Sequence, residues 1–154
     1  MILRFVMYTD KSVAQSMRAI NDRIQTTGTR TRPQMDGWVD KSGRFAMAVS
    51  STVRWRFRRK TFLHGRAERE SGMTIVRGNV PGGLSRNKQA LVLGMMIVIG
   101  LGLGFTQGSA ILTIVAVLAG AAFSIPLQGD FDNSEILLSE LQKALKAKFT
   151  PPNR

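Results

Sequence analysis

The sequence QALVLGMMIVIGLGLGFTQGSAILTIVAVLAGAAFSIP, residues 89–126, contains no charged side chain. One helix through all of it would be about 57 Å long at 1.5 Å per residue, whereas the hydrocarbon core of a bilayer is ~30 Å thick. Its only polar cluster, residues 106–109, leaves about 17 apolar residues on each side, which is long enough for a span. We therefore predict a transmembrane helical hairpin within residues 84–128, with spans at about 89–106 and 110–127.

A buried helical hairpin in a soluble protein is the alternative. In that case a chain of 154 residues with 22 lysines and arginines would have to enclose two uniformly apolar helices on every side. Membrane insertion is the simpler interpretation of this composition.

The basic side chains predict the orientation of the hairpin. The formal net charge is +12, and residues 1–88 hold 18 of the 22 basic residues and 6 of the 10 acidic ones. Lysines and arginines next to membrane spans stay on the cytoplasmic side, so we expect an integral protein of the plasma (inner) membrane with both termini in the cytoplasm. The flanking residues are Arg77, Arg86 and Lys88 before the first span and Lys143, Lys146 and Lys148 after the second.

Residues 1–83 are expected to form a cytosolic α+β domain with the element order β-α-β-β-β-β. Ser12 and Gln15 have the spacing of a capping box, and an apolar stripe of helical period follows them. From residue 37 onward the pattern alternates, with turn residues at 40–43 and 70–72. The fold class predicted is therefore a membrane α+β protein in which one helix covers an antiparallel sheet. The helical stripe consists of Val13, Met17, Ile20 and Ile24.

Residues 129–154 are expected to form a separate C-terminal amphipathic helix and tail. Residues 129–133 resemble a turn, and Asp132 with Glu135 resembles a cap for a helix running to about Phe149. The pattern leaves open whether this helix lies on the membrane, docks on the β domain or pairs with a neighbour. Its apolar face consists of Ile136, Leu137, Leu141, Leu145 and Phe149.

Small residues are spaced for close helix packing in both spans. Gly100 and Gly104 form a G-x-x-x-G pattern, and Ala116 with Gly120 gives a second pair of small residues four apart. These faces would pack the two helices of the hairpin against each other or against another subunit.

A basic stretch, Arg54, Arg56, Arg58, Arg59 and Lys60, alternates with apolar residues. On one continuous strand the rings of Trp55 and Phe57 would face the core, while the cations would face the solvent. Stacking on bases needs rings and cations on the same face, so this pattern argues against nucleic acid as a partner. It favours anionic lipid head groups or an acidic protein.

Four short segments, followed by the hairpin, resemble a family of uncharacterised bacterial membrane proteins. The segments are residues 43–45 (GRF), 56–59 (RFRR), 62–68 (FLHGRAE) and 72–75 (GMTI). In that family a small β-rich cytosolic domain precedes a helical pair. The resemblance covers residues 38–126 and implies this architecture, but no activity, cofactor or catalytic residue.

The inventory of reactive residues does not suggest an enzyme. His64 is the only histidine, and with no cysteine only carboxylates remain as metal ligands. We therefore expect no cofactor, no metal and no catalytic activity, but a non-catalytic accessory or scaffold subunit of a membrane protein complex, bound to other membrane subunits. The alternative is a membrane-tethered sensory domain that binds a lipid or small molecule, which requires a cavity of several hundred cubic ångströms.

Overall fold

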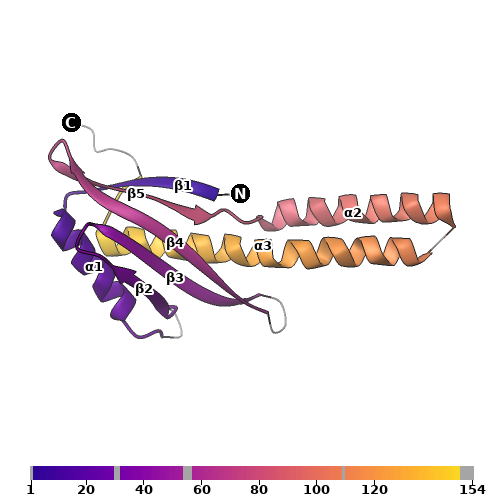
Figure 1. The fold of residues 1–154 in the computed structure, drawn as a ribbon, viewed down its shortest axis with the longest axis horizontal. Helices are drawn as coiled ribbons and strands as arrows, with labels where there is room; N and C mark the ends of the chain where they lie inside the picture. Colours follow the sequence, from indigo (N-terminus) through magenta and orange to yellow (C-terminus); the bar gives the residue numbers. More distant parts are fainter. Residues whose placement is uncertain (1, 30–31, 54–56, 109, 150–154) are drawn as a thin grey trace.

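The computed structural model describes residues 2–29, 32–53, 57–108 and 110–149 (Figure 1). The sheet lies at one end of the molecule, and two long helices extend from it side by side. In chain order the elements are β1 (Ile2–Thr9), α1 (Val13–Gln25), β2 (Met35–Val39), β3 (Arg44–Val53), β4 (Phe57–Glu70), β5 (Met73–Pro81), α2 (Arg86–Gln107) and α3 (Ala110–Leu145).

The five strands form one antiparallel sheet in the order β1-β5-β4-β3-β2, which confirms the predicted N-terminal sheet. β1 and β2 are consecutive strands but occupy opposite edges, so α1 carries the chain across the sheet. At the β1 edge, Tyr8 and Lys148 exchange backbone hydrogen bonds of 2.8 and 2.9 Å. The last described residues are therefore tied to the first strand.

Local signals gave the start of α1 and the β4–β5 turn correctly. The Ser12 hydroxyl accepts from the Gln15 N–H, and the Gln15 side chain accepts from the Ser12 N–H, which is the predicted capping box. Ser71 and Gly72 have φ of 52° and 86°, the left-handed values that a two-residue hairpin turn requires.

Two glycines of the sheet, Gly65 and Gly78, lie in one row of paired residues between two phenylalanines. Phe5 pairs with Gly78, Gly78 with Gly65, and Gly65 with Phe45. A Cβ on Gly65 would lie 2.4 Å from the Phe45 ring, and one on Gly78 would lie 2.5 Å from the Phe5 ring. The two glycines therefore leave room for two buried rings to pack closely against the neighbouring strands.

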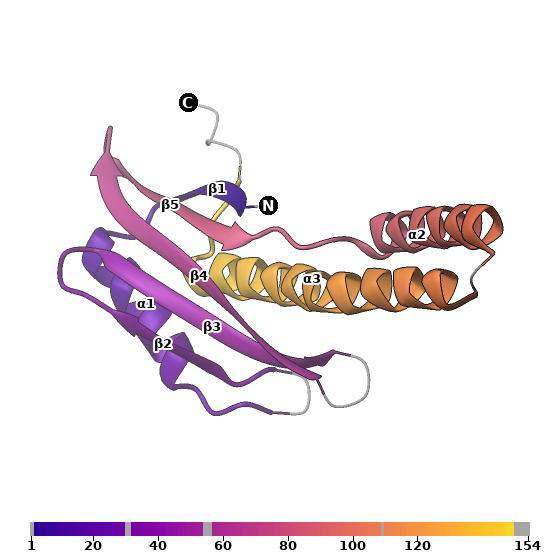
Figure 2. The same ribbon diagram turned by 45° about the vertical axis from the view of Figure 1, so that its right-hand side comes forward.

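Two helices contribute side chains to the core beneath the sheet. In Figure 2 α1 and the end of α3 lie behind the strands, on the same side of the sheet. The expectation of a single covering helix is thus incomplete, because the last turns of α3 also pack there. The buried cluster joins strand residues to Met17, Ile20 and Ile24 of α1 and to Leu137, Leu141 and Leu145 of α3.

The separate C-terminal helix predicted for residues 129–154 does not exist as such. α3 is one helix of 36 residues, and it runs through the expected turn at 129–133. Asp130 and Asn133 direct their side chains to β4 instead of their own backbone, so they do not interrupt the helix. Of the apolar face predicted for this segment, Leu137, Leu141 and Leu145 are buried in the core and Ile136 packs against it. Phe149 does not belong to it, because α3 ends at Leu145 and Phe149 is 49% exposed.

The hairpin of α2 and α3 has the composition of a membrane hairpin. Each helix contains a segment long and apolar enough to cross a membrane, and the side chains of these segments are mostly exposed. Phe105, for example, is 87% exposed. α2 ends at Gly108, whose left-handed φ of 62° lets its N–H bond to the Gly104 carbonyl.

We expect Leu141→Ala to reduce the free energy of unfolding by about 2–5 kcal/mol, because it leaves a cavity where α3 meets the sheet. The Leu141 side chain is 0% exposed. Thermal unfolding of the protein in detergent, followed by circular dichroism, measures the change. Leu118→Ala on the exposed surface of the hairpin is the matched control and should stay close to wild type. Equal stability of the two variants would contradict this placement of α3.

Candidate functional site

A network of hydrogen bonds joins α3 to β4 at the point where the apolar segment of α3 ends. Asp130 receives hydrogen bonds of 2.9 and 2.6 Å from the Arg59 guanidinium and one of 2.8 Å from the Thr61 hydroxyl. The Asn133 amide donates to the Arg59 carbonyl and to Thr61, both at 3.0 Å. We call this cluster of four residues the junction.

Charge and hydrogen bonding keep the junction carboxylate ionised. Burial would raise the pKa of Asp130, but the hydrogen bonds from Arg59 and Thr61 and the charge of Arg59 outweigh it and hold the pKa below its usual range. The same pairing raises the pKa of Arg59. The ion pair is therefore intact at neutral pH.

The linker between β5 and α2 is fastened to the same part of α3. The Leu84 N–H donates to the Leu127 carbonyl at 2.9 Å, and the Ser134 hydroxyl donates to the Pro81 carbonyl. Gly83 has a φ of 54°, and a Cβ there would lie 2.2 Å from the Phe131 nitrogen. Only a glycine fits this close approach in a left-handed conformation, so the start of α2 is held against α3.

A second buried carboxylate fixes α3 to α1. Glu140 accepts from Arg23 at 2.6 Å and from Lys143 at 3.0 Å, and Arg23 also donates to the Pro33 carbonyl at 3.0 Å. Burial would raise the pKa of Glu140, but these hydrogen bonds and charges lower it overall. Asp130 and Glu140 thus attach one helix to two different elements of the domain.

The predicted basic strand is not continuous. β3 ends at Val53 and β4 begins at Phe57, and these two residues are paired, so the chain reverses between them. Arg54 and Arg56 lie outside the described residues. Of the remaining three, Arg58 is exposed, Arg59 belongs to the junction, and Lys60 forms a 2.7 Å ion pair with Asp36.

The predicted small residues of the spans lie mostly between α2 and α3. A Cβ on Gly100 would be 3.1 Å from that of Ala116, and one on Gly120 would be 2.9 Å from Met96. The Thr113 hydroxyl donates to the Gly100 carbonyl at 2.8 Å across the same contact. Gly104 takes part in the cap of α2 through its carbonyl.

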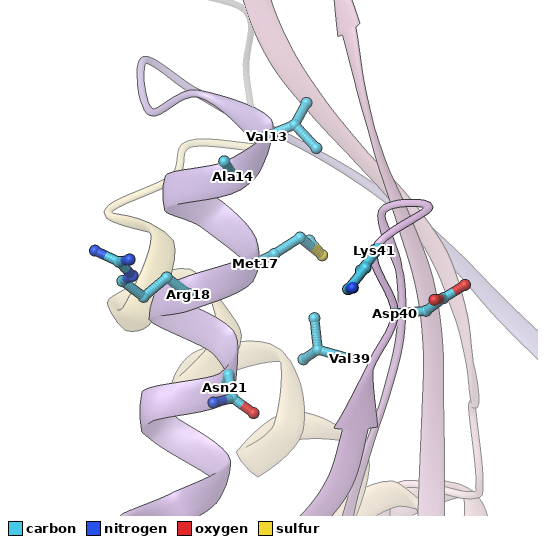
Figure 3. A pocket seen from close by; sticks show the side chains of 8 residues that line it. All are labelled: Val13, Ala14, Met17, Arg18, Asn21, Val39, Asp40 and Lys41. Atoms are coloured by element: carbon cyan, nitrogen blue, oxygen red, sulfur yellow. The ribbon is translucent and has the colours of Figure 1, made fainter.

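A groove of about 720 Å³ lies between α1 and the β2–β3 turn (Figure 3). Val13, Met17 and Val39 supply its apolar surface. In Figure 3 the Met17 and Lys41 side chains point toward each other across the groove, while Asp40 points away. The groove could accommodate an apolar group that ends in an anion.

The remaining candidate chemistry of the sequence concerned metal ligands and His64. Within the described part of the chain, no group of three or more His, Asp or Glu could hold a metal ion. His64 is exposed on the sheet and stacks on Phe62, with ring centroids 6.3 Å apart. No protein-family model matches the chain, and no curated protein matches it by sequence.

Sequence reasoning missed the junction because its members were interpreted separately. Asp130 was assigned to a turn and Arg59 to a solvent-facing strand. The available signal was an acidic residue directly after an apolar span, where a carboxylate close to lipid needs a cation.

We expect Asp130→Asn to lower the free energy of unfolding by about 1–2 kcal/mol at pH 7, a modest value because Arg59 is partly exposed. A lowered pKa contributes stability above the unfolded-state value of about 3.9 and loses it as the pH falls through the folded-state value. The difference between variant and wild type should therefore be constant above about pH 5 and shrink in more acidic solution.

Unfolding midpoints measured in detergent between pH 3 and 8 test this expectation. Asp132→Asn is the matched control, since it removes the same charge from α3 without touching Arg59. If the difference in unfolding midpoint between Asp130→Asn and the wild type did not change with pH, the ion pair would not be what stabilises the fold.

Proposed function

We propose that the protein is a non-catalytic, membrane-anchored scaffold subunit that holds its sheet domain in a fixed position beside a membrane complex. The observation that carries this proposal is the continuity of α3, which passes from an apolar, outward-exposed segment directly into the core of the domain. A flexible tether would need only a linker. A helix shared by both parts transmits position and orientation.

Several contacts support a rigid connection. The Arg59–Asp130 and Arg23–Glu140 ion pairs attach α3 to β4 and α1. The hydrogen bond from Leu84 to Leu127 attaches the base of α2 as well. Both helices of the hairpin are therefore fastened to the domain, which suits a subunit whose role is positional.

The proposed setting is the inner membrane of a bacterium, with the domain and both termini in the cytoplasm. Mostly exposed apolar segments support insertion of the hairpin, and the flanking basic residues support its orientation. Other membrane protein subunits would contact the outer surface of the hairpin. Arg58 and its basic neighbours would lie near anionic lipid head groups.

Purification from the native membrane in mild detergent should yield a complex larger than the monomer, measured by native mass spectrometry. Insertion of two glycines after Gln128 should preserve membrane insertion but greatly reduce the yield of that complex, because it interrupts α3 between its two halves. Recovery of the wild type only as a lone monomer would contradict the scaffold proposal.

Spin labels provide the control for the insertion. Because the chain contains no cysteine, the pair Ser50→Cys and Leu118→Cys can be labelled specifically. The distance distribution between the two labels should be narrow without the insertion and broad with it. An inserted protein that keeps a narrow distribution would show that the glycines had not uncoupled the two halves.

The groove of Figure 3 favours a second candidate function, the binding of an amphipathic anion by a membrane-tethered sensory domain. It differs from the internal cavity first expected, because the core beneath the sheet is filled by side chains of α1 and α3.

Octanoate, which combines an apolar chain with a carboxylate, is a suitable probe for this groove. It should raise the unfolding midpoint of the wild type, since a ligand that binds only the folded state stabilises it. Lys41→Gln should weaken binding roughly tenfold through loss of a charged contact, whereas Lys88→Gln should not. An identical response of both variants and the wild type would exclude the groove as the binding site.

A further inference from the structure

The face of the sheet opposite the helices carries both rings and cations, and no helix of the described residues covers it. In Figure 2 this face is turned toward the viewer and runs alongside the direction of α2 and α3 instead of lying across it. For a hairpin that crosses a membrane along its own axis, as proposed above, such an orientation would present the face to the surrounding solution. Trp38 is 51% exposed there and Phe62 48%.

Strand register arranges the polar residues of this face in two parallel rows. The first row contains Trp38 of β2, His64 of β4 and Asn79 of β5, joined through Ala46 of β3. The second row, two residues further along each strand, contains Arg44, Arg66 and Arg77, which are directly opposite one another on β3, β4 and β5.

Three arginines in direct register repel one another, so the arginine row is unfavourable unless anions approach it. Glu68 contacts Arg66 at 2.9 Å and Arg77 at 3.5 Å, and Glu70 contacts Arg77 at 2.8 Å. These carboxylates hold two guanidiniums in place from the far side of the row. Each guanidinium has five donors, so those two can still bind a further anion, and Arg44 adds a third cation.

The two rows line one shallow depression of about 280 Å³. Its floor is formed by small or buried residues, since Gly65, Gly78 and the buried Phe45 also line it. The aromatic rings and the arginine side chains therefore surround a shallow area of the sheet that a planar group can reach.

We propose that this depression binds a short single-stranded nucleic acid, with a base on Trp38 and the phosphates on the arginine row. The rows are about 7 Å apart, two residues along a strand, which is comparable to the separation of a base from its phosphate. Exposed rings on one sheet face beside a line of cations, here Trp38 of β2 and His64 of β4 with Ala46 of β3 between them, are the features that single-stranded nucleic-acid platforms combine.

The argument against nucleic acid as a partner, which was based on the basic stretch of the sequence, does not apply to this face. That argument required rings and cations on opposite faces of one continuous strand, whereas Val53 and Phe57 belong to two different, antiparallel strands and residues 54–56 lie outside the described part of the chain. An acidic polypeptide would use the arginine row but has no need of the first row, whose Trp38, His64 and Asn79 suit a base. The proposal does not depend on the scaffold function.

Fluorescence anisotropy of labelled U10 RNA and dT10 DNA tests the proposal, with the full chain in nanodiscs of neutral phosphatidylcholine. Trp38→Ala should weaken binding roughly tenfold, the loss typical of one stacked base, without changing its salt dependence. Arg44→Gln should weaken binding and reduce the slope of log K against log salt by about 0.7, the value for one phosphate contact. Arg18→Gln, an exposed arginine of α1, is the matched control and should bind as the wild type does.

Three results would overturn the proposal. One is no saturable binding of either oligonucleotide, and another is an equal loss of affinity in Arg18→Gln and Arg44→Gln, which would mean a diffuse charge effect. The third is displacement of the oligonucleotide by polyglutamate of matched charge together with unchanged affinity of Trp38→Ala, which would assign the face to an acidic polypeptide. Since the assay contains the protein alone, its failure leaves the scaffold proposal untouched.

Discussion

The Arg59–Asp130 ion pair resolves the main physical conflict in this chain. α3 must expose apolar side chains along its first half and bury a different set along its second half. A buried carboxylate at the boundary would be costly alone, but bonded to Arg59 and Thr61 it marks the position where the helix changes surroundings. The position of the sheet relative to the hairpin depends on this contact and on Glu140 ten residues later.

Local patterns in the sequence were sufficient for much of the fold. The break at residues 106–109, the Ser12 capping box and the turn at Ser71 and Gly72 each depend on neighbouring residues only, and each occurs as expected. These local patterns were enough to predict the hairpin, the first helix and the antiparallel sheet. Capping and turn rules concern side chains and backbone atoms only a few residues apart, so they can be applied without knowledge of the tertiary structure.

The errors arose where a distant partner decides the structure. Asp130 was interpreted as a turn residue because Arg59, 71 residues earlier in the chain, cannot be recognised as its partner from sequence. Residues 53–58 alternate equally well in a continuous strand and in one that reverses, so periodicity alone does not distinguish the two. The two rows of the candidate nucleic-acid face could not be predicted for the same reason, since only strand register places Trp38 and His64 on either side of Ala46 and Arg44 beside Arg66.

The pairing of Tyr8 with Lys148, together with the leucines that α3 contributes, has a consequence for biosynthesis. All five strands precede the hairpin in the chain, yet their core lacks Leu137, Leu141 and Leu145 until both apolar segments have been translated. The five strands can pair before that point, but the core beneath the sheet is complete only when the end of α3 is added. Newly made chains therefore carry an unfinished apolar sheet face until α3 is complete, and this face must be kept from aggregating during that interval.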